Sequence, residues 1–369
     1  MKPFDLTKLR KAITKNHNLS DGFHDPEVWI DTGNYAINYL ISSSFFKGVP
    51  LGKVSVFAGE SGSGKSYIVS GKIAQNAQKM GILPIILDSE FALDKKWMEK
   101  LGVGTGIDQM MRYPVSLVDD CANIINEVMK NFIADHSNDP KTEQPMLLFI
   151  VDSLNNLSTP TDVDQFNKGD MKGDMGRKPK QLKALVTQAL KLFGPYNIGM
   201  VATNHVYKSQ DQFKPDDVIS GGNGFIYAAS IIVQQEKLKL KEDEDGNKIT
   251  ETRGIRSKVK IVKSRYAKPF EEIEIQIPYD TGLNPYSGLF ELFEKNGTFI
   301  REGNSYIYTS LDGVITKQFK KAWKKDLDSL MLVMKETELR DIAAGEARGV
   351  DGKMADVPDL DDDDGDAAD

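Results

Sequence analysis

Residues 59–66 form the feature that most constrains this chain, because they complete the phosphate-loop pattern G-x-x-x-x-G-K-[ST]. The positions are Gly59, Glu60, Ser61, Gly62, Ser63, Gly64, Lys65 and Ser66. Glycines let successive backbone N–H groups point into one anion-binding concavity. Lys65 can place its ammonium on the β and γ phosphates, and Ser66 can hold Mg²⁺. The loop therefore predicts binding of a nucleoside triphosphate.

The segments around the loop support this prediction. Residues 54–58, Val-Ser-Val-Phe-Ala, are mostly apolar and predict a buried strand. Residues 65–80 predict a helix whose apolar side chains share one face, and Gly81 follows its end. The helix would point its positive N-terminal end at the phosphates.

Strand and helix patterns then alternate from residue 50 to about residue 235, which predicts an α/β fold with a mostly parallel sheet covered on both faces. The expected strands are 53–58, 82–88, 146–152, 198–204 and 229–234. Residues 234–240 and 256–262 predict a hairpin around Asp245-Gly246. The strictly alternating residues 272–277 predict a half-exposed antiparallel strand.

The chain divides into four expected regions. Residues 1–30, with a short basic helix at 6–15, are expected to be an oligomerisation segment. Residues 31–285 form the core, and residues 286–350 form a small C-terminal lobe. Residues 351–369 hold nine Asp and one Lys, and we expect this acidic tail to be disordered. The tail can be a solubilising segment or can mimic nucleic acid and compete for a basic groove.

Composition limits the location of the chain. No apolar run reaches membrane-spanning length, and the N-terminus lacks the apolar core of a secretory signal. A single cysteine, Cys121, fits a reducing compartment, so a cytoplasmic location without a membrane partner is expected. Residues 351–369 contribute −8 to the net charge of −7, which leaves +1 for residues 1–350. Charge alone therefore neither demands nor excludes a nucleic-acid partner.

Acidic residues follow two of the expected strands. Asp152 ends an apolar strand and is expected to help position Mg²⁺. Asp88 and Glu90 end the strand after the loop helix, and ligands of open α/β sheets sit at the carboxyl ends of strands. We expect Glu90 to orient and polarise an attacking water. Alternatively, Glu90 caps the next helix and Asp88 has the functional role.

Several motifs make the chain resemble the RecA-type recombinases. They are Asp88–Val103, Thr203-Asn204-His205, Gly221-Gly222-Asn223 and Val262–Phe270. The resemblance spans residues 28–295, and the chain is most similar to the phage UvsX-type recombinases. Residues 284–289 and the His at position 205 suggest that branch.

The resemblance implies roles in binding ATP with Mg²⁺. Glu90 falls on the catalytic glutamate, and Trp97, with Asp94 beside it, falls where an aromatic ring stacks on adenine. Trp97 can equally be a core residue paired with Leu101. Asn204 and His205 fall where the family senses the γ-phosphate.

Lys263 and Arg265 match a pair that, in the family, reaches the nucleotide of a neighbouring protomer. There they would stabilise charge on the transferring phosphoryl group. The alternative is that they are two exposed cations at a strand end.

Two long polar segments, residues 155–180 and 206–224, correspond to family loops that hold single-stranded DNA. Cations can follow the phosphates, and aromatic rings can stack on bases without reading sequence. The expected DNA-binding residues are Lys168, Lys172, Arg177, Lys178, Tyr207, Lys208, Phe213, Lys214, Gly221 and Gly222, with Phe166 beside them.

These observations predict a DNA-dependent ATPase that forms helical filaments on single-stranded DNA and pairs it with homologous duplex DNA in recombination, repair and replication. Expected partners are further copies of the chain, a single-strand-binding protein and a recombination mediator, in the cytoplasm of a bacterial host if the chain is phage-encoded. A ring-forming helicase and a regulatory ATPase that does not bind DNA are the alternatives.

Overall fold

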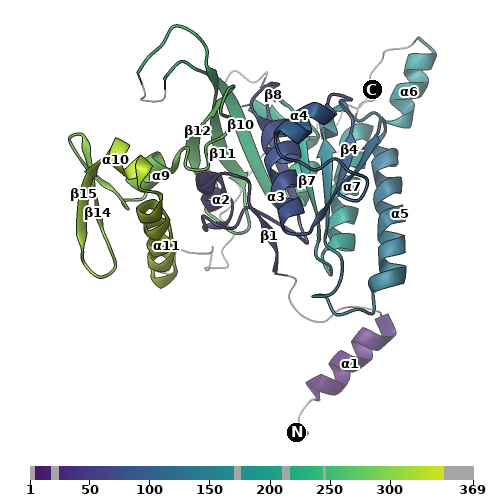
Figure 1. Cartoon of the computed structure of the whole chain (residues 1–369). Coiled ribbons are helices and arrows are strands. Elements are labelled where there is room, and N and C mark those ends of the chain that lie inside the picture. Colours follow the sequence, from purple (N-terminus) through teal and green to yellow (C-terminus); the bar gives the residue numbers. More distant parts are fainter. Residues whose placement is uncertain (1–4, 18–24, 170–175, 210–216, 244–246, 345–369) are drawn as a thin grey trace, which may run out of the picture.

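The computed structural model describes residues 5–17, 25–169, 176–209, 217–243 and 247–344. Its centre is an eight-stranded sheet with the strand order β12-β11-β10-β3-β7-β6-β4-β5 (Figure 1). These strands are β3 Val54–Gly59, β4 Leu83–Asp88, β5 Met111–Pro114, β6 Leu147–Asp152, β7 Ile198–Asn204, β10 Ile231–Leu240, β11 Gly254–Lys263 and β12 Glu272–Pro278. The predicted α/β class with a mostly parallel sheet is confirmed.

The direction of the strands decides where the polar strand ends meet. Six neighbouring strands pair in parallel, in the order β10, β3, β7, β6, β4 and β5. Strand β11 pairs antiparallel with both β10 and β12. Asp88 is the register partner of Asp152, and Ala58 is the partner of Asn204. The carboxyl ends of β3, β4, β6 and β7 therefore form one edge, which we call the carboxyl edge.

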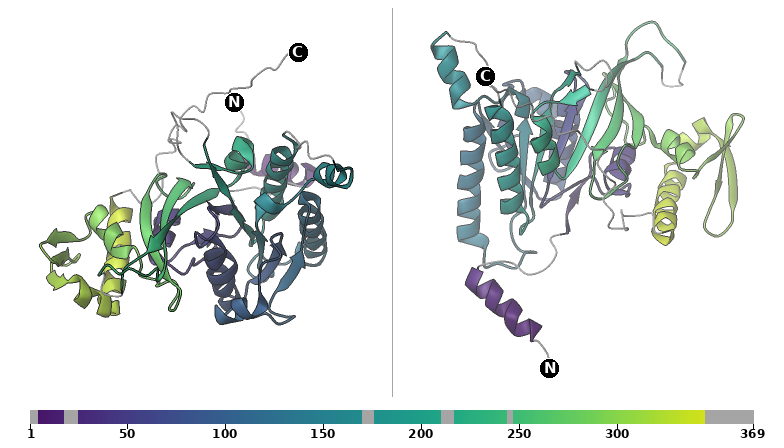
Figure 2. Two further views of the ribbon diagram at one scale, coloured as in Figure 1. Left: turned by 90° about the horizontal axis from the view of Figure 1, so that it is seen from above. Right: turned by 180° about the vertical axis from the view of Figure 1, so that it is seen from behind.

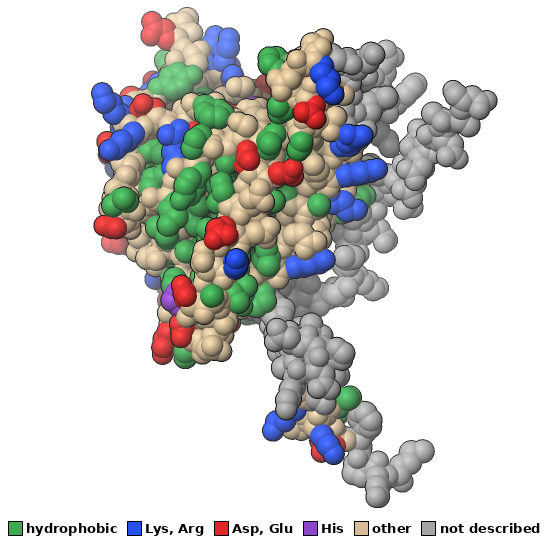
Figure 3. Space-filling model, turned by 90° about the vertical axis from the view of Figure 1, so that its right-hand side faces the viewer, with side chains coloured by type: hydrophobic (Ala, Val, Ile, Leu, Met, Phe, Trp, Pro, Cys, Tyr) green, Lys and Arg blue, Asp and Glu red, His purple; other side chains and the backbone are tan. Residues whose placement is uncertain are grey.

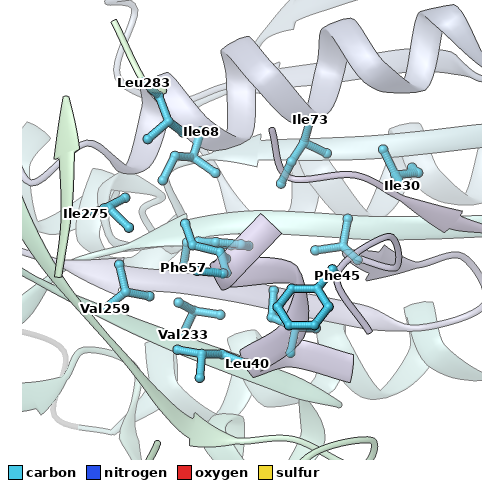
Figure 4. Packing of buried hydrophobic residues seen from close by; sticks show 14 of the residues in the cluster. Ile30, Leu40, Phe45, Phe57, Ile68, Ile73, Val233, Val259, Ile275 and Leu283 are labelled. Atoms are coloured by element: carbon cyan, nitrogen blue, oxygen red, sulfur yellow. The ribbon is translucent and has the colours of Figure 1, made fainter. Parts of the chain in front are cut away.

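Helices cover both faces of the sheet (Figure 2). One face packs against a layer that includes α2 Tyr35–Ser42, the π-helix η1 Tyr67–Ile73, α3 Ala74–Lys79 and α4 Lys95–Lys100. The other packs against α5 Val118–His136, α7 Arg177–Phe193 and α8 Gly222–Ala228. Figure 4 shows the buried side chains of this first layer, among them Ile68 and Ile73 of the helix after the phosphate loop and Phe57 and Val233 of the sheet. Burial of this apolar surface fixes the loop between a strand and a helix that cannot move independently.

The helix predicted over residues 65–80 is not one regular α-helix. It is a π-helix over Tyr67–Ile73 that continues as α3. Such a wider turn does not change which residues are apolar, so the spacing of apolar residues does not reveal it. Gly71 in this turn lies close to Leu101 after α4, since a Cβ at Gly71 would lie 2.5 Å from Leu101 Cδ1.

The C-terminal part has a sheet of its own, beside β12 in Figure 1. It consists of β13 Ile300–Glu302, β14 Ser305–Thr309 and β15 Ile315–Phe319, with α9 Leu289–Lys295, α10 Lys320–Lys325 and α11 Leu327–Ala343. Buried aromatic rings join these elements: Phe299 and Trp323 lie 5.0 Å apart between ring centroids. The acidic tail, residues 351–369, lies outside the described residues.

The remaining elements are short. They are α1 Leu6–His17, β1 Trp29–Ile30, β2 Val49–Pro50, η2 Leu154–Asn156, α6 Pro160–Asn167, β8 Val206–Lys208 and β9 Asp217–Ile219. Helix α1 stands apart from the body in Figure 1 and projects below it in Figure 3. The face of the body seen in Figure 3 carries a mixture of hydrophobic and charged side chains. In the described part of the chain, no helix combines the length and apolar character needed to cross a bilayer.

Candidate nucleotide site at the carboxyl edge

The phosphate loop has the geometry of an anion cradle. Gly62 and Gly64 have positive φ values of 73° and 97°, which other residues adopt only at a cost. Lys65 Nζ donates to the carbonyl oxygens of Gly59 and Glu60 at 2.8 and 2.7 Å. Its ammonium is thus folded back over the start of the loop, where it can interact with phosphate oxygens.

Burial changes the charge behaviour of Lys65. Desolvation lowers the pKa of its ammonium to about 8, although the carboxylates of Glu90, Asp152 and Glu60 oppose this shift. The nearby carboxylates therefore do not fully compensate the cost of burying the positive charge of Lys65. A polyanion bound at the loop would supply it and favour the protonated form.

Asp152 lies at the end of β6 within a group of hydroxyls. Its carboxylate accepts hydrogen bonds from Ser66 Oγ at 3.3 Å, Ser70 Oγ at 2.8 Å and Thr203 Oγ1 at 2.5 Å. Burial raises the pKa of Asp152, and these hydrogen bonds partly offset the shift. A carboxylate beside a serine hydroxyl supplies the hard oxygen donors that Mg²⁺ prefers, so Ser66 and Asp152 fit this metal.

Ser70 and Thr203 were not predicted as site residues. Ser70 follows Ser66 by four positions, which is one helical turn, and this spacing was the available signal. Thr203 is far from Asp152 in sequence, and only the pairing of β6 with β7 brings them together.

Glu90 and His205 meet at the same edge. Glu90 Oε1 lies 3.1 Å from His205 Nε2, and both side chains are partly exposed, at 29% and 27%. Asp88, in contrast, is fully buried and forms an ion pair with Arg112. A carboxylate that water cannot reach cannot polarise an attacking water, so the geometry favours Glu90 over Asp88.

Asp94 and Trp97 lie at the start of α4. Asp94 is the N-cap of this helix, and its Oδ1 accepts a hydrogen bond from Trp97 N at 2.9 Å. Trp97 is half-buried and packs against the core cluster below it. The indole thus has core contacts and also keeps an exposed part, and an adenine-stacking role stays a prediction.

Hydrogen bonds connect the carboxyl edge to the second polar segment. Asn204 Nδ2 donates to the Ser220 carbonyl at 2.6 Å, and Ser220 N donates to the His205 carbonyl at 3.0 Å. Ser220 Oγ also donates to Asn155 Oδ1 at 2.6 Å, where the first polar segment begins. Gly221 and Gly222, with φ values of 105° and 76°, follow directly and start α8. Both segments are thereby tied to the residues beside Glu90.

The described parts of the two polar segments contain regular secondary structure. Residues 206–224 contain the antiparallel strands β8 and β9, and residues 155–180 contain α6. Thr159 and Asp162 form a capping box and Pro160 starts the helix, a signal that the sequence contained. Arg177 and Lys178 begin α7 instead of lying in a loop.

The described basic and aromatic residues of these segments differ in accessibility. Lys168 and Tyr207 are exposed, and Arg177 donates to Thr161 Oγ1 at 2.8 Å. Burial lowers the pKa of Lys178, whose ammonium donates to the Asn155 carbonyl. Lys208 pairs with Asp217 at 2.7 Å, which raises its pKa. Lys172, Phe213 and Lys214 lie outside the described residues.

Lys263 and Arg265 lie away from the phosphate loop. Lys263 pairs with Ile232 in the sheet, and because β11 is antiparallel, Arg265 follows towards the opposite edge. Lys263 Nζ donates to the carbonyls of Ile226 and Tyr227 at the end of α8, at 3.1 and 2.6 Å. Burial, and then the charge of Arg265, lowers the pKa of Lys263 to about 8.

Comparisons with known proteins agree with this architecture. The profile of the RecA N-terminal domain matches residues 18–284. Protein RecA of Leptospira biflexa is 30% identical over 272 residues, which cover 71% of this chain and 62% of that protein. Protein RecA of Colwellia psychrerythraea is 28% identical over 321 residues, covering 85% and 83% of the two chains. The match thus spans less than two thirds of the Leptospira relative.

Proposed function

This chain belongs to the RecA family. We propose that it is an ATP-dependent DNA recombinase that forms filaments on single-stranded DNA and catalyses homologous pairing and strand exchange. The contact between Glu90 and His205 carries the proposal. It joins the position that would activate water to a residue whose backbone bonds the second polar segment. ATP binding and DNA binding can therefore influence one another over a few hydrogen bonds.

We assign the nucleotide chemistry as follows. ATP with Mg²⁺ would supply the phosphoryl group and the charge that neutralises its oxygens. Residues 59–66 would cradle the phosphates, Lys65 would hold the β and γ phosphates, and Ser66 with Asp152 would hold the metal. Glu90 would orient and polarise water, His205 and Asn204 would respond to the γ-phosphate, and Trp97 with Asp94 would border adenine.

Lys263 and Arg265 would act on the nucleotide of a neighbouring protomer. Their place away from the phosphate loop of the same chain supports this assignment, because the antiparallel β11 ends towards the opposite edge of the sheet. Repeated head-to-tail contacts of this kind give an open helical polymer. Hydrolysis would then depend on filament formation.

DNA would bind along the two polar segments. Single strands would contact Lys168, Lys172, Arg177, Lys178, Tyr207, Lys208, Phe213, Lys214, Gly221 and Gly222, with backbone and stacking contacts that tolerate any sequence. We extend the proposal to a single-strand-binding protein and a mediator as partners, to a function in replication, to an origin in the phage UvsX-type branch, and to the cytoplasm of a bacterial host.

One assay tests the function. ATP turnover is measured with and without unstructured single-stranded DNA, together with strand exchange between homologous molecules. We expect DNA to stimulate turnover and exchange to occur. Stimulated turnover with unwinding but no exchange would support a helicase, and turnover that ignores DNA would support a regulatory ATPase.

A variant tests the assignment of Glu90. Glu90→Gln keeps the shape and loses the carboxylate, so we expect turnover to fall by about 10²–10⁴-fold, the usual contribution of a positioned acid or base. Affinity for an ATP analogue should stay within about threefold, because the phosphate loop is unchanged. Exposed Glu302→Gln in the C-terminal sheet is the control. Normal turnover by Glu90→Gln would reject the assignment.

A further inference from the structure

We propose that Arg112 is a positioning residue that holds Glu90 in place through Asp88. The inference rests on the proposed function, since it explains how the catalytic carboxylate is oriented. Arg112 lies on β5, outside every motif that the sequence suggests. It touches neither the phosphate loop nor His205 in any described contact, so its effect would be indirect.

The contacts form a short chain across two strand ends. Arg112 Nη2 donates to Asp88 Oδ2 at 2.5 Å. The other oxygen of this carboxylate, Oδ1, accepts a hydrogen bond from the backbone N–H of Glu90 at 3.2 Å. The Glu90 side chain then reaches His205 at 3.1 Å. One carboxylate group thus connects the guanidinium to the backbone of the proposed catalytic residue.

Burial makes Asp88 dependent on Arg112. The Asp88 side chain is fully buried, and a buried carboxylate is costly unless a cation and hydrogen bonds compensate it. A guanidinium is planar and its donors have fixed directions, so it also sets the plane of the carboxylate. With Oδ2 held by Arg112, Oδ1 is directed at Glu90.

The backbone at Glu90 needs this support. The strand ladder ends at Asp88, and beyond it Glu90 N has only the Asp152 carbonyl, at 3.3 Å, besides Asp88 among its described contacts. The next residue, Phe91, has a positive φ of 54° and is 62% exposed. A non-glycine residue in this conformation costs about 1–3 kcal/mol and persists only when its surroundings fix it. Two acceptors on the Glu90 N–H supply that fixation.

A purely structural ion pair is the competing explanation, and three variants separate the two. Arg112→Met removes the charge and the directed donors, and Arg112→Lys keeps the charge without the planar fork. The double variant Asp88→Asn/Arg112→Met removes both charges, which restores electrostatic balance but leaves the introduced side-chain amide free to rotate. Arg301→Met, at an exposed pair with Glu294 in the C-terminal part, is the matched control.

The measurements are the kcat and KM of DNA-dependent ATP turnover, the affinity for an ATP analogue, thermal unfolding, and the His205 imidazole resonances of the full chain. The chain contains four histidines, so these resonances can be assigned by substitution. Glu90→Gln gives the reference for His205 without its carboxylate partner.

We expect Arg112→Met to lower kcat on the order of tenfold to a hundredfold, as a misplaced catalytic group does, while analogue affinity stays within about twofold. Its His205 resonances should move towards those of Glu90→Gln. Arg112→Lys should recover part of kcat. The double variant should regain the unfolding temperature but not kcat.

Two results would overturn the proposal. One is unchanged His205 resonances in Arg112→Met, and the other is recovery of kcat together with the unfolding temperature in the double variant. The resonances do not depend on turnover. If the unmodified chain fails to hydrolyse ATP while His205 still responds to Arg112, the proposed function fails and the positioning role stands.

Discussion

The carboxyl edge of the sheet and the end of β11 carry cations in opposite situations. At the carboxyl edge, Lys65 lies among carboxylates and hydroxyls that a single chain supplies. At the end of β11, Lys263 has Arg265 beside it and carbonyls of α8 as its described partners. Both lysines have a pKa of about 8 through burial, yet only one has a phosphate cradle around it. In the proposed filament, the carboxyl edge would be the half of the site that binds ATP, and the end of β11 would complete the site of a neighbouring protomer.

Removal of the Lys65 ammonium should weaken nucleotide binding at the carboxyl edge. Lys65→Ala deletes the ammonium that contacts phosphate oxygens, so we expect affinity for an ATP analogue to fall by at least about 100-fold, given the strength of charge-assisted hydrogen bonds in buried sites. Fluorescence titration of the analogue measures the effect. Affinity within threefold of the unmodified chain would show that the cradle does not depend on Lys65.

Removing Lys263 should have a different effect. In Lys263→Ala we expect DNA-dependent turnover to fall by about 10³-fold, as loss of a charge-stabilising finger does. The monomer should bind the analogue normally, because its own cradle is intact. Mixing Lys263→Ala with Glu90→Gln should restore some turnover at the mixed interfaces. Normal turnover by Lys263→Ala alone would contradict the proposal that Lys263 completes the site of a neighbouring protomer.

The affinity for nucleotide should depend on pH through Lys65. Burial lowers the pKa of Lys65 from 10.5 to about 8, and the protonated form is the one that attracts phosphate. The dissociation constant of the analogue should therefore be flat below pH 8 and rise above it, approaching about tenfold per pH unit as binding becomes linked to uptake of one proton.

The control for this pH effect is Lys263→Ala, because Lys263 has the same pKa of about 8. The pH dependence should persist in this variant, since Lys65 causes it. A dissociation constant that does not change between pH 7 and pH 9, measured in buffers of equal ionic strength, would contradict the assignment.

The smallest effect concerns the support of Asp152. Thr203→Val removes a donor from this buried carboxylate, so we expect the free energy of unfolding to fall by about 1–3 kcal/mol. Urea unfolding measures it. Thr309→Val, at an exposed position of β14, is the control and should change the free energy by no more than about 0.5 kcal/mol. Equal effects of the two substitutions would mean that Asp152 does not depend on Thr203.

Local patterns predicted much of the fold. The residues themselves predicted the phosphate loop, the strands that end at Asp88, Asp152 and Asn204, and the alternating strand over 272–277. The hairpin of β10 and β11 also agrees, although its predicted turn at Asp245-Gly246 lies outside the described residues. These features could be predicted because they depend on residues adjacent in the sequence, or on the rule that parallel strands end at the same edge of a sheet.

Other features were not predictable in this way. The π-helix after the phosphate loop and the helix α6 replaced a regular helix and a loop, respectively. The partners of Asp152, the pairing of Asp88 with Arg112 and the contact of Lys263 with α8 join residues between 24 and 86 positions apart. Apolar spacing contains no information on such contacts.

The residues alone were enough to predict a phosphate loop in an α/β sheet, because backbone conformation and apolar periodicity are local properties, and the resemblance of several motifs to RecA-type recombinases added the type of sheet. The tertiary structure alone decided which side chains share charge and hydrogen bonds at the carboxyl edge. Strand order and register make that decision, since they bring together ends of β3, β4, β6 and β7 that are distant in the chain. It also placed Lys263 away from the loop of its own chain, because β11 runs antiparallel to the strands that hold the nucleotide site.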